Sequence, residues 1–361
     1  MNRGVASPSP SLARKVYFLI PGDPDRRTGG TIYDRRIMAG LAALGWSVAL
    51  QRLDASFPAP TPAALAEADC VLAAMPNQSL AVIDGLALGA MPEVAAAHGD
   101  RLRLIGLVHH PLALETGLDE AQRQRLLFSE REALRQVRQV IVTSPSTVRA
   151  LVDYDVAPER CAVVLPGVDP APLATGSGRR EFTWLCTASL TPRKGHAVLF
   201  RALARLKDRA WRLRCAGGDV HGPATAAHLR TLVGELGLSD RVEWLGELET
   251  VALEAAYQQA DGFVLPSFYE GYGMVLAEAL ARGLPIISTT AGAIPDTVPV
   301  NAGLLVPPGD EAALAEALVR FLDEPGLRER LAAGARAARE TLADWSVVST
   351  RFAGELEEVL A

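Results

Sequence analysis

At 361 residues the chain is long for one α/β core, and its length favours two domains of about 170 to 180 residues each. Hydrophobic residues make up 49% and charged residues 22%, which is ordinary for a soluble globular protein, and the net charge of -6 argues against a general nucleic-acid-binding protein. The four cysteines form no CxxC pair and no apolar run reaches the ~20 residues of a membrane span, so we expect a reduced, cytoplasmic protein.

The first half of the chain alternates predicted strands with predicted helices. Residues 1–14 begin with a stretch rich in Ser and Pro and are expected to form a flexible tail before a strand at Lys15–Ile20, a loop with Gly29 and Gly30, and a helix at Tyr33–Leu44. The pattern continues with strands at Trp46–Leu50, Asp69–Ala74, Arg103–His109 and Val140–Thr143, and with helices at Leu80–Leu88, Glu120–Arg138 and Pro145–Val152. This alternation predicts a parallel sheet with helices on both faces.

A stretch from Pro166 to Arg180, rich in Pro, Gly, Ser and Ala, indicates a linker. Beyond it the pattern returns, with strands at Phe182–Cys186, Trp211–Ala216, Val242–Leu245, Gly262–Leu265, Pro285–Ser288 and Gly303–Val306 and with helices between them. The predicted fold class is α/β, with two facing doubly wound Rossmann-like domains at residues 15–168 and 169–344. Ligands of such sheets bind beyond the carboxyl ends of the strands, so the loops after the strands decide function.

The stretch from Pro266 to Leu280 follows a predicted strand and leads through a glycine-containing loop into a helix. We expect this helix to begin near Gly273, where unpaired N–H groups and the positive end of the helix dipole suit an anion. Glu270 lies on the loop, and Glu278 lies about one and a half turns into the helix, with its side chain leaning back toward the N-terminus. The two acids beside an anion site suit a ligand with phosphate and hydroxyl groups, such as a nucleotide sugar.

Two other loops of the second half follow predicted strands and converge on the same edge. Arg193 and Lys194 are placed to neutralise a phosphate, although an isolated basic pair is also typical of a solvated turn; the following Gly195 and helix start favour phosphate. Gly217 follows another strand and admits a close approach of a ligand to the backbone.

In the first half, His109 and His110 stand at a strand end. Neighbouring residues of a strand point to opposite faces, so at most one of them reaches the expected cleft, and a structural role is an equal alternative. No third ligand stands at a convincing spacing, so a zinc site is not expected. Gly29 and Gly30 also admit a ligand, but a plain turn explains them equally well.

In combination these motifs resemble those of the retaining glycosyltransferases of family four, which have the GT-B fold. The similarity spans nearly the whole chain and is weakest between about Gln51 and Gly99. The stretches that carry it are Pro166–Asp169, Leu190–Gly195, Pro266–Gly273, Glu278–Ala281, Gly283–Pro285 and Ala291–Asp296. Two departures occur: Ala188 and Ser189 stand where the family usually has Gly-Arg, for which Arg193 is a candidate replacement, and Asp296 stands in place of a Glu.

The resemblance implies that Glu270 and His110, rather than His109, lie by the transferred sugar, that Lys194 neutralises the diphosphate and that Glu278 binds the ribose hydroxyls. The donor-binding residues that it implies are Gly29, Gly30, Arg193, Lys194, Gly217, Leu245, Gly271, Tyr272, Gly273, Met274, Val275 and Glu278. The helix at residues 345–361 is implied to return to the first domain.

The function implied is a metal-independent retaining transfer of a sugar from a UDP- or GDP-linked donor to a hydroxyl acceptor, which is a small molecule, a glycan or a lipid. No cofactor beyond this co-substrate is expected. Two alternatives stay open: a nucleotide-sugar epimerase of the same architecture, and a nucleotide-sugar-binding protein without catalysis. Five arginines on the helix at Glu120–Arg138 could contact an anionic membrane surface. The interspersed acids Glu130 and Glu132 favour the alternative, a helix face exposed to solvent. The oligomeric state stays open.

Overall fold

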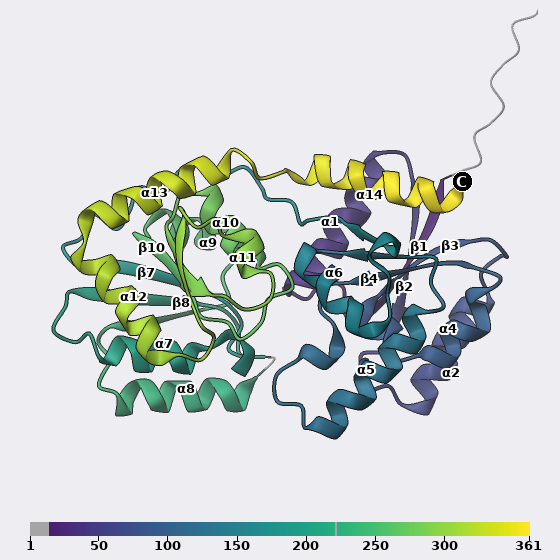
Figure 1. Ribbon diagram of the computed structural model, residues 1–361, viewed down its shortest axis with the longest axis horizontal. Helices are drawn as coiled ribbons and strands as arrows, with labels where there is room; N and C mark the ends of the chain where they lie inside the picture. The colour runs from purple at the N-terminus through teal and green to yellow at the C-terminus, as the bar shows by residue number, and fades with distance from the viewer. Residues whose placement is uncertain (1–13, 221) are drawn as a thin grey trace, which may run out of the picture.

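The computed structural model describes residues 14–220 and 222–361, so all but the last residue of the predicted tail lies outside the described part. The described chain forms two lobes, each built on a parallel six-stranded sheet with helices on both faces (Figure 1). The predicted fold class, two facing doubly wound α/β units, is confirmed.

The first lobe has the strand order β2-β1-β3-β4-β5-β6. Its strands are β1 Lys15–Pro21, β2 Ser47–Leu53, β3 Leu80–Asp84, β4 Arg103–Val108, β5 Gln139–Val142 and β6 Cys161–Val163. Its longer helices are α1 Gly29–Ala43, α2 Pro62–Ala73, α4 Pro92–Gly99, α5 Glu120–Leu134 and α6 Pro145–Leu151, and a single turn, α3 Gly85–Leu88, follows β3. The order places β1, β3 and β4 side by side, so the loops after them meet at one edge.

Two predicted elements of this lobe are wrong. Asp69–Ala74, expected as a strand, forms the end of helix α2, which begins with Pro62 after the Thr61 cap. Leu80–Leu88, expected as a helix, begins with the fully buried strand β3 and continues into α3. Short apolar runs fit a buried strand and a buried helix equally well. Here Leu80–Asp84 forms a strand because it pairs with β1 and β4 in the sheet. Helix α4 was not predicted, although Pro92 marks its first turn.

The second lobe has the order β12-β11-β10-β7-β8-β9. Its strands are β7 Phe182–Thr187, β8 Trp211–Ala216, β9 Val242–Gly246, β10 Gly262–Leu265, β11 Ile286–Thr289 and β12 Gly303–Val306. Its helices are α7 His196–Ala204, α8 Pro223–Glu235, α9 Thr250–Gln258, α10 Met274–Ala281, α11 Ile294–Thr297, α12 Glu311–Asp323 and α13 Pro325–Arg339. The central strands β7 and β10 are neighbours, which brings the loops after them together.

The last helix, α14 Trp345–Leu360, runs back over the first lobe and lies along α1 (Figure 1). Its buried residues Val348, Phe352 and Leu356 belong to the core around β1, where the rings of Phe352 and Phe18 stack with centroids 6.0 Å apart. Asp344 caps the helix by accepting hydrogen bonds from two backbone amides. The chain therefore passes between the lobes twice.

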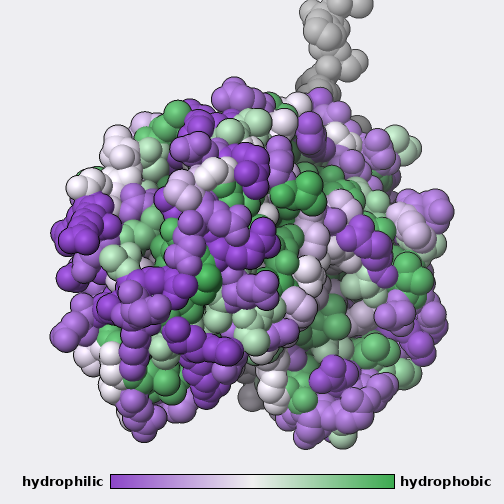
Figure 2. Space-filling model, turned by 60° about the vertical axis from the view of Figure 1, so that its left-hand side comes forward, coloured by the Kyte–Doolittle hydropathy of each residue, from purple (hydrophilic) through white to green (hydrophobic). Residues whose placement is uncertain are grey.

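The surface is mixed in character. On the face drawn in Figure 2, hydrophobic side chains are scattered among hydrophilic ones. Within residues 14–220 and 222–361, no helix has the length and apolar character that a membrane crossing requires. On α5, Arg131 and Arg135 form ion pairs with Glu132 and Asp155.

Candidate active site

Helix α10 begins where strand β10 and its loop lead into the interface between the lobes. Gly273, at the N-cap, has φ +85, and no side chain within the described residues caps the helix. The left-handed conformation favours glycine, and it turns the chain so that the first N–H groups of α10 stay free of side-chain acceptors. The expected helix start near Gly273 is confirmed.

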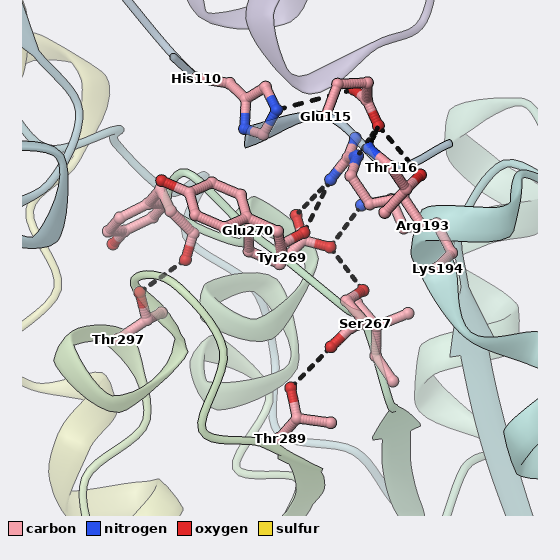
Figure 3. Close-up of polar contacts among 12 residues, drawn as sticks. His110, Glu115, Thr116, Arg193, Lys194, Ser267, Tyr269, Glu270, Thr289 and Thr297 are labelled. Atoms are coloured by element: carbon pink, nitrogen blue, oxygen red, sulfur yellow. Dashed lines mark hydrogen bonds and ion pairs between the residues drawn. The ribbon is translucent and has the colours of Figure 1, made fainter. Parts of the chain in front are cut away.

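Glu270 and Lys194 form a largely buried ion pair at this point (Figure 3). The Lys194 Nζ lies 2.6 Å from Glu270 Oε1, and the Ser267 hydroxyl donates to the same oxygen at 2.6 Å. Burial acts to raise the pKa of Glu270, but the charges of Lys194 and Arg193 outweigh it, and the pKa is lowered. Glu270 is therefore a carboxylate with a fixed orientation.

The backbone around this pair is packed too tightly for a side chain at Gly195. A Cβ on Gly195, whose φ is +72, would lie 2.0 Å from the carbonyl oxygen of Pro266. The Phe268 amide also donates to the Arg193 carbonyl at 2.7 Å. The loop after β7 is thus fastened to the loop after β10, which fixes Lys194 beside Glu270.

Arg193 reaches from this loop toward the first lobe (Figure 3). It donates to the Tyr269 carbonyl at 2.8 Å, lies 3.7 Å from Glu270 Oε2, and lies 3.4 Å from Glu115 Oε1 of the first lobe. Arg193 therefore adds a second positive charge next to Lys194. Its role as a replacement for the Arg missing at Ser189 stays a prediction.

His110 lies at the other side of the same cluster, with its ring edge-on to Tyr269 and the centroids 4.6 Å apart. Neither ring nitrogen makes a hydrogen bond within the described residues, although both are closed off from solvent; the nearest acid, Glu115, has its Oε2 3.7 Å from Nε2 (Figure 3). Burial, with the nearby charge of Arg193, lowers the pKa of His110 to about 4. His110 is thus a neutral imidazole near neutral pH, with unused hydrogen-bonding capacity beside Glu270 and Lys194.

Glu278 lies on α10 but has different partners from Glu270. The Tyr257 hydroxyl donates to Glu278 Oε2 at 2.9 Å, and a further contact of 3.1 Å joins Tyr257 to Thr187. Burial raises the pKa of Glu278, against the opposing effect of the Tyr257 hydrogen bond. The structure does not bring the two predicted carboxylates into contact; it gives each its own set of partners on the second lobe.

Three predicted glycines stand where backbone or ring atoms come close. A Cβ on Gly271 would lie 1.9 Å from the His109 carbonyl oxygen, and one on Gly30 would lie 3.2 Å from the His109 ring. A Cβ on Gly217 would lie 1.8 Å from the Ala188 carbonyl oxygen, because the ends of β8 and β7 pack together. Gly271 therefore marks a point where the two lobes touch.

The remaining predicted residues lie around these points. Gly29 begins α1, and a Cβ there would be 3.7 Å from the sulfur of Met274. The Tyr272 carbonyl accepts a hydrogen bond from Thr297 at 2.7 Å, and the Val275 carbonyl lies on the first turn of α10 near Tyr257. Leu245 is half-buried near the end of β9, whose terminal residue Gly246 accepts a hydrogen bond from the Gly217 amide.

Two acids of the first lobe were not among the predicted site residues. Asp34 on α1 and Asp84 at the end of β3 are buried beside His109, and the His109 Nε2 lies 2.9 Å from Asp34 Oδ1. The ligand atoms of these three residues lie within 4.8 Å of one another, a spacing that suits a small cation. A signal was available for Asp34: it is a charged residue next to Tyr33 and one turn before Ile37 on the buried face of α1.

Further contacts join the lobes around the site. Arg27 donates to the Leu248 carbonyl at 2.9 Å, and Arg36 pairs with Asp169. The Ser146 hydroxyl lies 2.6 Å from Asp296, the residue that replaces the usual Glu of the resembled family. The structure therefore presents the lobes in contact along the loops that carry the candidate residues.

Two doubly wound lobes that meet at the carboxyl ends of their strands define the GT-B class of fold. Residues 174–338 match the family described as "Glycosyl transferases group 1", and residues 28–172 match the one described as "Glycosyltransferase Family 4". The chain therefore belongs to the group 1, family 4 glycosyltransferases, whose two descriptions match its two lobes.

Curated relatives agree with this assignment. The chain is 30% identical to the MMP alpha-(1->4)-mannosyltransferase of Mycolicibacterium hassiacum, over 72% of this chain and 66% of that relative. It is 30% identical to the D-inositol 3-phosphate glycosyltransferase of Salinispora tropica, over 60% of this chain and 50% of that relative. The matches thus span between half and two thirds of the relatives' own lengths.

Solved structures show the same fold at lower identity. Sucrose-phosphate synthase from Thermosynechococcus elongatus superimposes with a TM-score of 0.81 at 24% identity, covering 96% of this chain and 99% of that one. Anabaena HepE in complex with UDP-glucose superimposes with a TM-score of 0.76 at 19% identity, covering 95% and 99%.

Proposed function

We propose that this protein is a retaining glycosyltransferase that moves a sugar from a UDP- or GDP-linked donor to a hydroxyl acceptor, without a metal or other cofactor. The observation that carries the proposal is the buried Lys194–Glu270 pair beside the uncapped start of α10. It joins a fixed positive charge, a fixed carboxylate and free backbone donors at one point. HepE, which has the same fold, was solved with UDP-glucose, and this likeness supports a nucleotide-sugar donor.

The donor diphosphate is assigned to the positive side of this cluster. Breaking the anomeric bond builds negative charge on the leaving diphosphate, and groups already aimed at that charge stabilise the transition state. Lys194, Arg193 and the amides of Gly273–Val275 supply positive charge and N–H donors from two adjoining loops. Because the cationic side chains are already in place, this part of the reaction needs no metal ion.

The sugar and the nucleoside are assigned to different carboxylates. Glu270, held by Ser267 and Lys194, and the neutral His110 are proposed to contact the sugar. Glu278, held by Tyr257, is proposed to bind the ribose hydroxyls with its other oxygen. Because Tyr257 anchors one oxygen of this carboxylate, the other oxygen is free to accept hydrogen bonds. Both neighbouring hydroxyls of a ribose can donate such bonds.

Retention is proposed to occur by attack from the face that the diphosphate leaves. Glu270 already pairs with a lysine and a hydroxyl, which makes it a poor candidate for a covalent nucleophile. In the proposed step the bond from the anomeric carbon to the phosphate oxygen breaks, the bond to the acceptor oxygen forms, and the acceptor proton passes to the departing phosphate. The acceptor is a small molecule, a glycan or a lipid.

A panel of nucleotide sugars tests the proposal. The purified protein is incubated with UDP-glucose, UDP-galactose, UDP-N-acetylglucosamine and GDP-mannose, and the free nucleoside diphosphate is measured together with the sugar products. Slow release of the diphosphate with at least one donor is expected. Isomerised donor would instead indicate an epimerase, and a thermal shift without turnover would indicate a binding protein.

A further inference from the structure

A buried row of three polar side chains lies in the first lobe, apart from the residues assigned to the donor. Asp34 comes from α1, Asp84 ends β3, and His109 directly follows β4. Asp34 is 0% exposed and Asp84 is 5% exposed, so neither carboxylate is solvated. Burying two acids is costly unless they are paired, and this arrangement therefore needs a physical explanation.

The two carboxylates lie close together, since one oxygen of each is within 4.8 Å of the other and of a His109 ring nitrogen. Asp34 Oδ2 is closed off from solvent and has no N–H or O–H partner among the described residues, while Asp84 Oδ1 accepts a hydrogen bond from the Leu86 amide at 2.7 Å. Burial, together with the charge of Asp34, raises the pKa of Asp84 to about 7. A proton held by the two acids leaves one negative charge on the pair.

That charge holds His109 in one orientation. The His109 Nε2 lies 2.9 Å from Asp34 Oδ1, Tyr33 packs edge-on at 5.2 Å between ring centroids, and Gly30 leaves the ring face uncovered by a side chain. Nδ1 has no hydrogen-bond partner in the described part of the chain, yet it is not among the atoms closed off from solvent, and 18% of the side chain is exposed. The ring therefore has one fixed end and one accessible end.

His109 lies where the lobes meet: a Cβ on Gly271 would come 1.9 Å from its carbonyl oxygen, and its ring faces Gly30, which follows Gly29 at a point close to Met274 of the second lobe. Gly271 is next to Glu270, which is assigned to the sugar. His109 thus stands on the first-lobe side of the proposed reaction centre, opposite the phosphate-binding charges on the second lobe.

We propose, building on the function proposed above, that His109 binds the reacting hydroxyl of the acceptor through Nδ1, and that Asp34 and Asp84 are positioning residues for this imidazole. A hydroxyl group fits both states of the ring, since it donates to the neutral form and accepts from the imidazolium. A carboxylate or a phosphate would instead approach the negative charge held beneath the ring. The reacting group of the acceptor is therefore an uncharged hydroxyl, and water takes its place during hydrolysis.

Hydrolysis of the donor tests this inference without knowledge of the acceptor, because water is the acceptor. The rate of diphosphate release is measured for His109→Gln and Asp34→Asn with the most active donor of the panel, and UDP or GDP affinity is measured by calorimetry. Both variants are expected to lower turnover tenfold or more while nucleotide affinity stays within twofold. Asp34→Asn preserves the shape of the side chain, removes its charge and replaces one acceptor oxygen with an NH2 donor.

Two substitutions at Asp84 test whether a hydrogen-bond donor at this position, and not a charge, is what positions Asp34 and His109. Asp84→Asn keeps an N–H that can donate to Asp34, so turnover is expected to stay within threefold of wild type. Asp84→Leu removes the donor, so a loss similar to that of Asp34→Asn is expected. The matched control is Asp69→Asn, which changes another Asp–His pair of the same lobe, with 2.7 Å between Asp69 and His98, and it should leave turnover unchanged.

Several outcomes would overturn the inference. Wild-type turnover in His109→Gln and Asp34→Asn would show that the proposed contact with the acceptor is not made. A parallel fall in nucleotide affinity would show that these residues bind the donor instead. Loss of wild-type activity in EDTA, with recovery on adding Mn²⁺ or Zn²⁺, would make the row a metal site. Absence of any diphosphate release by the wild type would instead contradict the proposed transferase itself.

Discussion

The two faces that meet between the lobes are built in different ways. On the second lobe, the candidate residues come mainly from two continuous stretches, residues 189–195 and 266–278, which follow neighbouring strands. On the first lobe, Asp34, Asp84 and His109 come from three separate elements and meet only in the folded chain. The proposed donor side is thus recognisable as a motif in the sequence, whereas the proposed acceptor side is a property of the fold.

The largest expected effect comes from Lys194, the positive charge proposed to bind the donor phosphates. Lys194→Ala removes a cation that is 14% exposed, and we expect diphosphate release to fall by about 10²–10³-fold, the range for loss of one preorganised charge-stabilising group. Steady-state kinetics with the best donor measures this. Lys207→Ala, an exposed lysine just after α7, serves as control and should retain wild-type turnover. A Lys194→Ala variant within threefold of wild type would contradict the assignment.

The next effect separates the two carboxylates of the second lobe. Glu278→Ala should weaken binding of the nucleoside diphosphate by about tenfold or more, since hydrogen bonds to charged groups contribute about 1.5–3 kcal/mol. Glu270→Ala should lower turnover more than it lowers donor affinity. Calorimetry and initial rates on both variants give the comparison. If neither variant differed from wild type, the division of roles between the two acids would be wrong.

A change at the contact between the lobes tests whether the two faces must meet. Gly271→Ala places a Cβ 1.9 Å from the His109 carbonyl oxygen, so we expect the lobes to separate slightly and turnover to fall by about tenfold, with nucleotide affinity largely kept. The rate and the affinity are measured as above. Gly234→Ala is the control, because a Cβ there meets nothing within 4 Å. Equal turnover in the two variants would show that close contact at Gly271 is not needed.

The last prediction concerns the stability of the first-lobe face and not turnover. Glu130 on α5 is fully buried and accepts the Leu112 amide at 2.8 Å, just after His110, and burial raises the pKa of Glu130 to about 8. Between the unfolded pKa near 4.5 and this value, the folded protein holds a proton that the unfolded chain has released. Its contribution to stability is therefore present at low pH and lost as the pH rises through this window, by up to about 1.4 kcal/mol per pH unit.

Urea unfolding of wild type and Glu130→Gln at pH 5, 6.5 and 8 measures this contribution. The glutamine is neutral throughout, so the free energy of unfolding of wild type should fall relative to that of the variant as the pH rises. Parallel pH profiles for the two proteins would show that Glu130 does not hold the proton.

The fold was largely predictable because its signals are local. The strands of the second lobe are apolar runs separated by glycine loops, and the start of α10 is marked by Gly273, which adopts the left-handed conformation there. The errors fell between Asp69 and Leu88, where short apolar runs carry no distinct period. In that region the sheet itself selects strand or helix, and its influence is not visible in the local sequence.

The part of the candidate site that could be predicted is the part whose residues lie close together in the sequence. Lys194, Glu270 and Glu278 could be named because glycines and helix starts surround them in the sequence. The partnership of Asp34 with His109 joins residues 75 positions apart, so only the parallel pairing of β1, β3 and β4 brings them together. The sequence indicated that at most one histidine would reach the interface, but the structure gives both a position beside it, with different partners.

The most direct test of the central claim, retaining transfer from a nucleotide sugar, is to follow donor turnover by ¹H NMR. With an α-linked donor such as UDP-glucose, the first sugar released or transferred is expected to carry the α-anomeric signal before mutarotation mixes the anomers. Lys194→Ala should show the same signal at a much lower rate. A β-anomer as the first product would contradict the account.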